Sequence, residues 1–400
     1  MSRLKIVAVF IAVVLILGLL AAGGAYLAAS SKQKKASSEL KTAKDLLEND
    51  KTEPAIALLK EHIAKYPRMN TTPEATFLLA RTLWEWKEDH EEALPLFERL
   101  IREHPGAPYG RQALYYKALA LLDKRPYDEE TRDFFQELRE DASVKHLAFI
   151  ARYGLALADL DSGSEKKAAS ALEDLLELSL PDELRDRIEI TLGELNLRLL
   201  FSPALRPDQE YYTIKRGDYI YKLAKKFRVT QELLMKCNNI SDPKKLSIGQ
   251  RIKIPDIDLS IHVDKYSNTL TLMNHGKFFK KYVVRTGAYE GQTPVGEFKI
   301  QNKKKNPRWV NPRTHKLYPP GDPQNELGTR WMSFQNDMLG IHGTIKPETV
   351  GFYSSFGCIG MYRKDVEELF DLVPVGTPIK IVGKMNPGLV EESEALGYRE

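Results

Sequence analysis

The character of the sequence changes at residues 202–207, a short segment that contains Pro203 and ends at Pro207. Before it, from about residue 37, apolar residues recur three and four positions apart, which is the spacing of amphipathic helices. Further on, from about residue 259, apolar and polar residues alternate as in half-buried β-strands. A proline-bounded segment between two such patterns is typical of a domain boundary. The sequence therefore predicts a multidomain protein with an all-α part followed by a mostly-β part.

The net charge changes sign at the same place. Residues 36–205 contain 23 Lys or Arg and 33 Asp or Glu, a net charge of −10, and residues 206–400 contain 31 and 22, a net charge of +9. Residues 1–35 add +5, so the whole-chain value of +4 hides two oppositely charged parts. With so small a total and no recognised nucleic-acid-binding motif, we expect no nucleic-acid partner.

Residues 6–29 carry no charge and are flanked by Lys or Arg on both sides. As a helix with about 1.5 Å of rise per residue, this stretch would reach roughly 36 Å, more than a hydrocarbon core of about 30 Å. The sequence therefore predicts a transmembrane signal-anchor. The alternative is a cleaved signal peptide, because small residues such as Ala28 and Ala29 lie near its end. Either interpretation exports the rest of the chain.

The helical part, residues 37–205, contains an internal repeat. Residues 57–67 align with residues 95–105, their closing prolines lie 38 positions apart, and residues 171–181 repeat the pattern more weakly. Each proline ends a helix, because proline cannot continue the hydrogen-bond ladder. A helix pair that recurs at this interval resembles tetratricopeptide repeats, which stack into a solenoid. Such a solenoid is either a surface for a protein partner or a spacer, and the sequence favours neither.

Residues 211–255 form the next unit. Short strands are expected at 212–214 and 251–254, with two helices between them, the second capped by Thr230. This βααβ pattern resembles a LysM domain, although Tyr219 stands where that family commonly has Thr. The resemblance implies binding to N-acetylglucosamine-containing glycans, chiefly peptidoglycan. The unit has 11 basic and 3 acidic residues, which indicates either a solvated basic face or attraction to an anionic polymer.

The two cysteines are too few for a disulfide framework, so any cysteine chemistry rests on a single thiol. Cys237 has no local base or metal partner and is expected to be a packing residue. Cys358 follows Gly357, which lets a substrate approach the backbone closely, and N–H groups around Cys358 could hold an oxyanion. A thiolate needs a base to form it, and His342, at the end of an expected strand, is the leading candidate. By itself, a Cys and a His sixteen positions apart are more often structural than catalytic.

Four motifs give this pair a context. Residues 293–298 (TPVGEF), 327–328 (LG), 341–344 (IHGT) and 355–361 (SFGCIGM) occur in this order and together resemble the YkuD-type L,D-transpeptidase catalytic domain, over residues 259–383. The resemblance implies a mostly-β fold with Cys358 as nucleophile and His342 as base. It also implies that Ser355 and Gly357 shape the oxyanion and active-site loop, and that no metal or organic cofactor takes part.

The reaction implied by this resemblance is acyl transfer on peptidoglycan. Cys358 would attack the carbonyl before the terminal D-alanine of a tetrapeptide stem, and an amine of a neighbouring stem would resolve the acyl-enzyme into a 3→3 cross-link. With water as the acceptor, the same site would be an L,D-carboxypeptidase. A third interpretation is a peptidoglycan-binding scaffold whose catalytic domain has decayed.

Support for the scaffold comes from Gly360, because the family usually carries Arg or Asn two positions after the cysteine. Arg330 or Arg363 is expected to substitute for that side chain, and with Gly343 and Thr344 they complete the predicted substrate-binding set.

Two further segments carry predictions. Residues 299–321 contain seven Lys or Arg and no acidic residue, which predicts a long loop that is either simply solvated or a lid attracting stem-peptide carboxylates. The polar residues 386–400 are expected to be a flexible tail.

Taken together, the sequence predicts a bacterial, single-pass membrane protein whose bulk faces the periplasm or cell wall. Its expected partners are peptidoglycan strands and stem peptides, the membrane through its N-terminal helix, and a protein on the helical repeats. The expected roles are peptidoglycan biosynthesis, cell-wall organisation and cell shape.

Overall fold

The computed structural model describes residues 26–27, 29–141, 145–202, 211–311, 314–336 and 338–399. The predicted membrane anchor at 6–29 lies almost entirely outside these residues. Within the described ranges, no helix is both long enough and apolar enough to span a bilayer. The chain forms two compact units, the first ending at Ser162 and the second beginning at Gly163.

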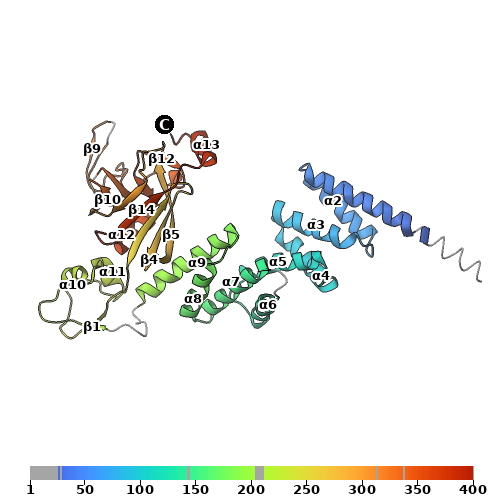
Figure 1. The fold of residues 1–400 in the computed structure, drawn as a ribbon, viewed down its shortest axis with the longest axis horizontal. Helices are drawn as coiled ribbons and strands as arrows, with labels where there is room; N and C mark the ends of the chain where they lie inside the picture. The colour runs from blue at the N-terminus through green and yellow to red at the C-terminus, as the bar shows by residue number, and fades with distance from the viewer. Residues whose placement is uncertain are drawn as a thin grey trace, which may run out of the picture. The chain divides into compact units, whose positions relative to one another are not determined.

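The described residues of the first unit form helices and the turns between them, as the three- and four-residue apolar spacing predicts (Figure 1). Most consecutive helices pack against one another, and small residues such as Ala75, Ala93 and Ala113 are fully buried where the helices approach closely. Phe97 stacks on Tyr116 with ring centroids 4.4 Å apart. After a helix over residues 29–48, the helices are α2 (Thr52–Lys65), α3 (Thr72–Trp86), α4 (His90–Glu103), α5 (Pro108–Leu122), α6 (Glu129–Glu140) and α7 (Lys145–Asp161).

The second unit begins with two more helices, α8 (Glu165–Leu176) and α9 (Asp182–Phe201). The sequence places them with the preceding repeats, whereas α9 packs on strand β5 (Lys277–Gly287) of the β-rich part. The Asn196 side chain donates a hydrogen bond to the backbone carbonyl of Phe279 at 3.0 Å. Residues 202–207 therefore do not separate two independent bodies, because the last helix before them belongs to the unit that follows.

Acidic residues of α8 and α9 meet basic residues of β5. Lys281 pairs with Asp186 at 2.8 Å and with Glu189 at 2.9 Å, and Lys280 pairs with Glu194 at 2.9 Å. The opposite net charges of the two halves of the sequence thus meet in part at this interface.

The LysM-like unit has the predicted βααβ order: β1 (Tyr211–Thr213), α10 (Ile220–Phe227), α11 (Gln231–Lys236) and β2 (Arg251–Lys253), with the two strands antiparallel. Thr230 caps α11 by accepting a hydrogen bond from the Leu233 N–H at 3.0 Å, as predicted. Cys237 is fully buried, and burial raises the pKa of its thiol to about 11, which fits the packing role expected for it.

The β-rich part is built on one large sheet. In the described residues its strand order is β6-β14-β3-β4-β5-β13-β11-β10-β7, with β12 paired to β5. Besides β5, these strands are β3 (Leu259–Asp264), β4 (Thr269–Asn274), β6 (Gly296–Lys299), β7 (Asn302–Lys305), β10 (Arg330–Gln335), β11 (Leu339–Gly343), β12 (Tyr353–Ser355), β13 (Ile359–Met361) and β14 (Pro378–Val382). A separate hairpin joins β8 (Trp309–Val310) and β9 (Leu317–Tyr318). A 3-10 turn, η1 (Pro347–Thr349), precedes β12.

Alternate residues of the strands form the core of this sheet. Ile261 and Val263 of β3 are fully buried, as are Leu270 and Leu272 of β4. Helix α12 (Arg363–Leu372) contacts β10 and β11 and buries Leu369 completely.

The prediction of a flexible tail is wrong for the described residues after 386. Pro387–Ala395 form helix α13, whose fully buried Ser393 accepts a hydrogen bond from the Tyr353 N–H at 3.2 Å. Beyond the helix, the Arg399 side chain donates to the Ala288 carbonyl at 2.7 Å. Polar composition is misleading here, because these polar groups are bonded to the sheet instead of water.

Candidate active site

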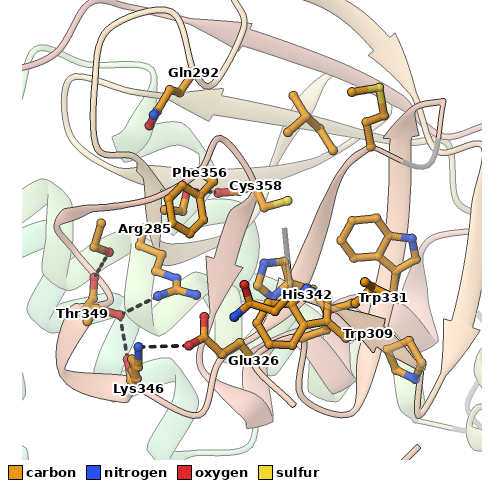
Figure 2. A pocket seen from close by; sticks show the side chains of 18 of the residues that line it. Arg285, Gln292, Trp309, Glu326, Trp331, His342, Lys346, Thr349, Phe356 and Cys358 are labelled. Carbon is orange, nitrogen blue, oxygen red and sulfur yellow. Dashed lines mark hydrogen bonds and ion pairs between the residues drawn. The ribbon is translucent and has the colours of Figure 1, made fainter. Parts of the chain in front are cut away.

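Both predicted catalytic residues line one cavity of about 930 Å³ in the β-rich part (Figure 2). His342 lies on β11, and Cys358 directly precedes β13. Strands β11 and β13 pair in parallel, with His342 opposite Gly360. Residues that are sixteen positions apart in the sequence are thereby held on neighbouring strands. Figure 2 shows both side chains among those that line the cavity. The structure thus brings the two residues together as the predicted mechanism requires.

The loop that carries Cys358 is fixed by hydrogen bonds. The Ser355 hydroxyl donates to the Cys358 carbonyl at 2.6 Å and accepts from the Gly357 N–H at 3.1 Å. Gly357 has φ of +115°, and a Cβ there would collide with the Gln292 carbonyl, so only glycine fits. Ser355 and Gly357 therefore lie where the predicted loop-shaping role places them.

Thr293 ties this loop to the end of β5. Its hydroxyl donates to the Gly357 carbonyl at 2.9 Å and accepts from the Gly287 N–H at 2.8 Å. The sequence singles out Thr293 only as part of the TPVGEF motif. That Thr293 joins β5 to the loop of Cys358 is apparent only in the fold, where Gly287, Thr293 and Gly357 meet.

His342 is 3% exposed and has a defined tautomer. Its Nδ1 is hydrogen-bonded to the Gly343 carbonyl, and because a carbonyl can only accept, Nδ1 carries the proton. Nε2 is then the unprotonated nitrogen, as a general base requires. Burial, aided by the positive charge of Arg285, lowers the pKa of His342 to about 3, so the ring is neutral at physiological pH.

Cys358 is also uncharged in the free enzyme. Burial raises the pKa of its thiol, while a backbone hydrogen bond at Gly340 and the charge of Arg285 act in the opposite direction. A neutral thiol beside a neutral imidazole is not a preformed ion pair. We therefore expect proton transfer from Cys358 to His342 to accompany the attack on substrate.

Arg285 is the residue of this site that the sequence analysis missed. It lies on β5 opposite Gly360 of β13, is 5% exposed, and lines the cavity. Its Nη1 donates to the Thr349 hydroxyl at 3.1 Å. A signal was present in the sequence, because Arg285 interrupts the apolar end of a strand that leads into Gly287.

The four predicted substrate-binding residues do not line this cavity. Gly343 and Thr344 follow His342, and the Thr344 N–H donates to the Met361 carbonyl at 3.0 Å. Arg330 donates to the Thr329 carbonyl at 2.9 Å, and Arg363 to the Glu367 carboxylate at 3.3 Å. Neither Arg330 nor Arg363 lines the cavity, so neither takes the place of the polar side chain that Gly360 lacks.

The lysine-rich segment differs from the predicted loop. Lys303, Lys304 and Lys305 lie on β7, which pairs with β10. Lys303 donates to the Phe370 and Val373 carbonyls at the end of α12, at 2.5 and 2.6 Å, and burial lowers its pKa to about 8. Lys305 pairs with Glu232 of the LysM-like unit at 2.7 Å. Lys303 and Lys305 thus join β7 to neighbouring elements through polar contacts, while Lys304 and residues 307–311 line the cavity.

Within the part of the chain that the structure describes, no three His, Cys, Asp or Glu residues are grouped so as to hold a metal ion.

Comparisons with known proteins match the same three parts of the chain: the repeats, the LysM-like unit and the β-rich part. A model of the L,D-transpeptidase catalytic domain (YkuD) matches residues 258–381. A protein of Bacillus subtilis (strain 168) named "Putative L,D-transpeptidase YkuD" is 36% identical over 176 residues, which span 42% of this chain and 97% of the relative. The chain belongs to the L,D-transpeptidase family. A second relative in that organism, named "Putative L,D-transpeptidase YqjB", is 37% identical over 129 residues, 31% of this chain and 71% of the relative.

The other parts of this L,D-transpeptidase also match family models. The LysM domain model matches residues 212–255, and a tetratricopeptide repeat model matches residues 40–108 and 87–145. The three resemblances identified in the sequence are thereby confirmed. Membership of the L,D-transpeptidase family implies an acyltransferase, and together with the LysM domain it implies binding to peptidoglycan.

Proposed function

We propose that this L,D-transpeptidase forms 3→3 cross-links in peptidoglycan through an acyl-enzyme on Cys358. The observation that carries the proposal is the convergence of Cys358 and His342 on one cavity, with the unprotonated Nε2 of His342 available to take the thiol proton. Family membership supports the class of reaction, and the LysM domain supports the substrate.

In the first half-reaction, Nε2 of His342 takes the proton from the Cys358 thiol as the sulfur attacks the carbonyl before the terminal D-alanine. Backbone N–H groups around Cys358 would hold the oxyanion. The intermediate collapses as the C–N bond breaks, and His342 returns the proton to the departing amine. D-alanine leaves, and the stem remains as a thioester on Cys358.

In the second half-reaction, an amine of a neighbouring stem attacks the thioester. His342 accepts the proton from the attacking amine, the C–S bond breaks, and the leaving thiolate of Cys358 takes that proton. The product is an amide cross-link, and the enzyme returns to its starting state. Water in place of the amine would give the carboxypeptidase reaction.

We also propose that the enzyme works at the cell wall, held to the bacterial membrane by residues 6–29, with its bulk facing the periplasm or cell wall. Tethering one end and binding glycan next to the catalytic domain would raise the effective concentration of stem peptides at the cavity. The repeats would serve as a spacer or as a surface for a protein partner, and the activity would contribute to cell-wall organisation and shape.

The test uses the full chain, tetrapeptide muropeptides and mass spectrometry of the products. We expect free D-alanine and a 3→3 dimer, both lost in Cys358→Ala. Tripeptide without dimer would instead establish the carboxypeptidase. If the wild type and Cys358→Ala gave identical products, the enzyme proposal would fail and the scaffold interpretation would stand.

A further inference from the structure

Among the described residues, Arg285 is a buried cation that forms no ion pair, although the charges of Glu326 and Glu348 are near enough to favour its protonated form. Its side chain is 5% exposed, and no Asp or Glu of the described residues forms an ion pair with its guanidinium within 4.0 Å. Its Nε is buried and has no hydrogen-bond partner in that part of the chain, and its Nη1 bonds only to the neutral Thr349 hydroxyl. A charge held away from water without a partner is costly, so such an arrangement persists where an anion completes it.

Gly360 makes the position of Arg285 possible. The two residues are opposite each other in the β5–β13 pair, so their side chains share a face of the sheet. A Cβ at residue 360 would collide with Nε of Arg285. Because residue 360 has no side chain, Arg285 of the neighbouring strand occupies the space beside it.

Arg285 lines the same cavity as the reacting groups, and its charge acts on the pKa of both His342 and Cys358. Figure 2 shows its hydrogen bond to Thr349. Lys346, another cation in this part of the cavity, is paired with Glu326 at 3.0 Å. Arg285 thus differs from Lys346 in having its charge available for an anion brought by the substrate.

We propose that Arg285 binds the terminal carboxylate of the donor peptide, the carboxylate of the residue that leaves. This assignment rests on the proposed function, in which Cys358 attacks the carbonyl one residue before the C-terminus. The terminal carboxylate then lies about one residue length, roughly 3.5 Å, beyond the reacting carbonyl, which suits a side chain that lies beside the nucleophile. Arg285 would therefore make the enzyme select peptides with a free C-terminus.

The test measures binding without turnover. In the full-length Cys358→Ala chain, calorimetry compares a tetrapeptide stem as free acid with the same stem as C-terminal amide. We expect the acid to bind more tightly, and the added change Arg285→Gln to weaken acid binding about 10- to 100-fold while leaving amide binding unchanged. Arg198→Gln is the matched control, because Arg198 lies on α9, outside the cavity, and should affect neither ligand.

Moving the arginine from position 285 to position 360 distinguishes the effect of its charge on binding from an effect on folding. Gly360→Arg alone should weaken acid binding, because the new side chain displaces Arg285. The double variant Arg285→Ser/Gly360→Arg removes that collision and returns a guanidinium to the same space, so it should regain most of the preference for the acid. Thermal unfolding of each variant identifies any loss that comes from misfolding.

Equal weakening of acid and amide by Arg285→Gln would overturn the assignment, as would no weakening or a wild-type site that does not distinguish the two ligands. Failure of the double variant to recover the preference, although folded, would also count against it. These outcomes are independent of the proposed function, because Cys358→Ala binds without reacting. The muropeptide assay fails or succeeds separately.

Discussion

At the scale of single residues, the site depends on which groups stay uncharged. His342 is buried beside Arg285, and Cys358 is partly buried at the cavity wall, so neither ionises readily in the free enzyme. Neutrality preserves His342 as a base, because a protonated ring could not accept the thiol proton.

The depressed pKa of His342 makes a prediction for acid stability. The ring titrates near its ordinary pKa of about 6.5 in the unfolded chain, but at about 3 in the folded one. The unfolded state therefore binds the proton first as pH falls, and this residue's contribution to stability, present above pH 6.5, is lost on the way down to about pH 3. The loss is about 1.4 kcal/mol per pH unit over that window.

Urea unfolding of wild type and His342→Gln at pH 7 and pH 5 measures this contribution. The variant lacks the titrating group, so its free energy of unfolding should fall by about 1–2 kcal/mol less than that of the wild type between the two pH values. Parallel losses in both proteins would show that His342 is not held neutral by the fold.

The sequence points to Cys358, His342, Ser355 and Gly357 because they lie in short motifs that can be recognised without knowing the fold. Arg285 escapes because its meaning depends on Gly360, which is 75 positions away and becomes its neighbour only through the β5–β13 pairing. An arginine at the apolar end of a strand is a local signal, but its pairing with Gly360 cannot be read from the sequence, and so the predicted substitutes were Arg330 and Arg363.

At the scale of elements, the interface between α9 and β5 accounts for part of the charge difference between the two halves of the chain. Apolar spacing shows that α9 has a buried face, but it does not show against which element that face packs. The acidic residues of α9 and the lysines of β5 are complementary, and the helix belongs with the sheet although composition groups it with the repeats.

Charge reversal on β5 tests this interface. Lys281→Glu would place a third carboxylate beside Asp186 and Glu189, at a position that is only partly exposed, and should lower the free energy of unfolding of the second unit by about 1–3 kcal/mol. Lys277→Glu is the matched control, since Lys277 is 69% exposed and its pair with Glu173 should matter much less.

Thermal unfolding of the two variants gives the comparison. A similar small change in both would mean that the ion pairs of α9 are superficial and that the helix is held to the sheet by apolar packing alone.

At the scale of the whole molecule, the LysM domain and the catalytic domain share one apolar core within the second unit. Polar contacts add to it: Lys305 pairs with Glu232 at 2.7 Å, Lys236 pairs with Asp371 at 2.7 Å, and the Thr230 hydroxyl donates to the Asp371 carbonyl. Lys253 of the LysM domain donates to the Ser202 carbonyl after α9 at 2.7 Å. The LysM domain is therefore packed against the catalytic domain and is not joined to it by a linker alone.

The order of parts was predictable from sequence, because each part has its own pattern: helical spacing, the βααβ unit and the cysteine motif. The joints between parts were not, because they depend on contacts such as Lys253 with Ser202 and Arg399 with Ala288 that join separate segments. The prediction of a membrane anchor at residues 6–29 stays a prediction, since it falls almost entirely outside the described residues.

The central claim is that Cys358 carries the acyl group. Intact-protein mass spectrometry of the full chain, quenched with acid soon after mixing with a tetrapeptide stem, measures this directly. The account predicts an added mass equal to the stem minus alanine, mapped by proteolysis to the peptide containing Cys358. Cys358→Ala should show none of it, and His342→Gln should accumulate it much more slowly. An adduct on another residue, or product formed by Cys358→Ala at the wild-type rate, would contradict the account.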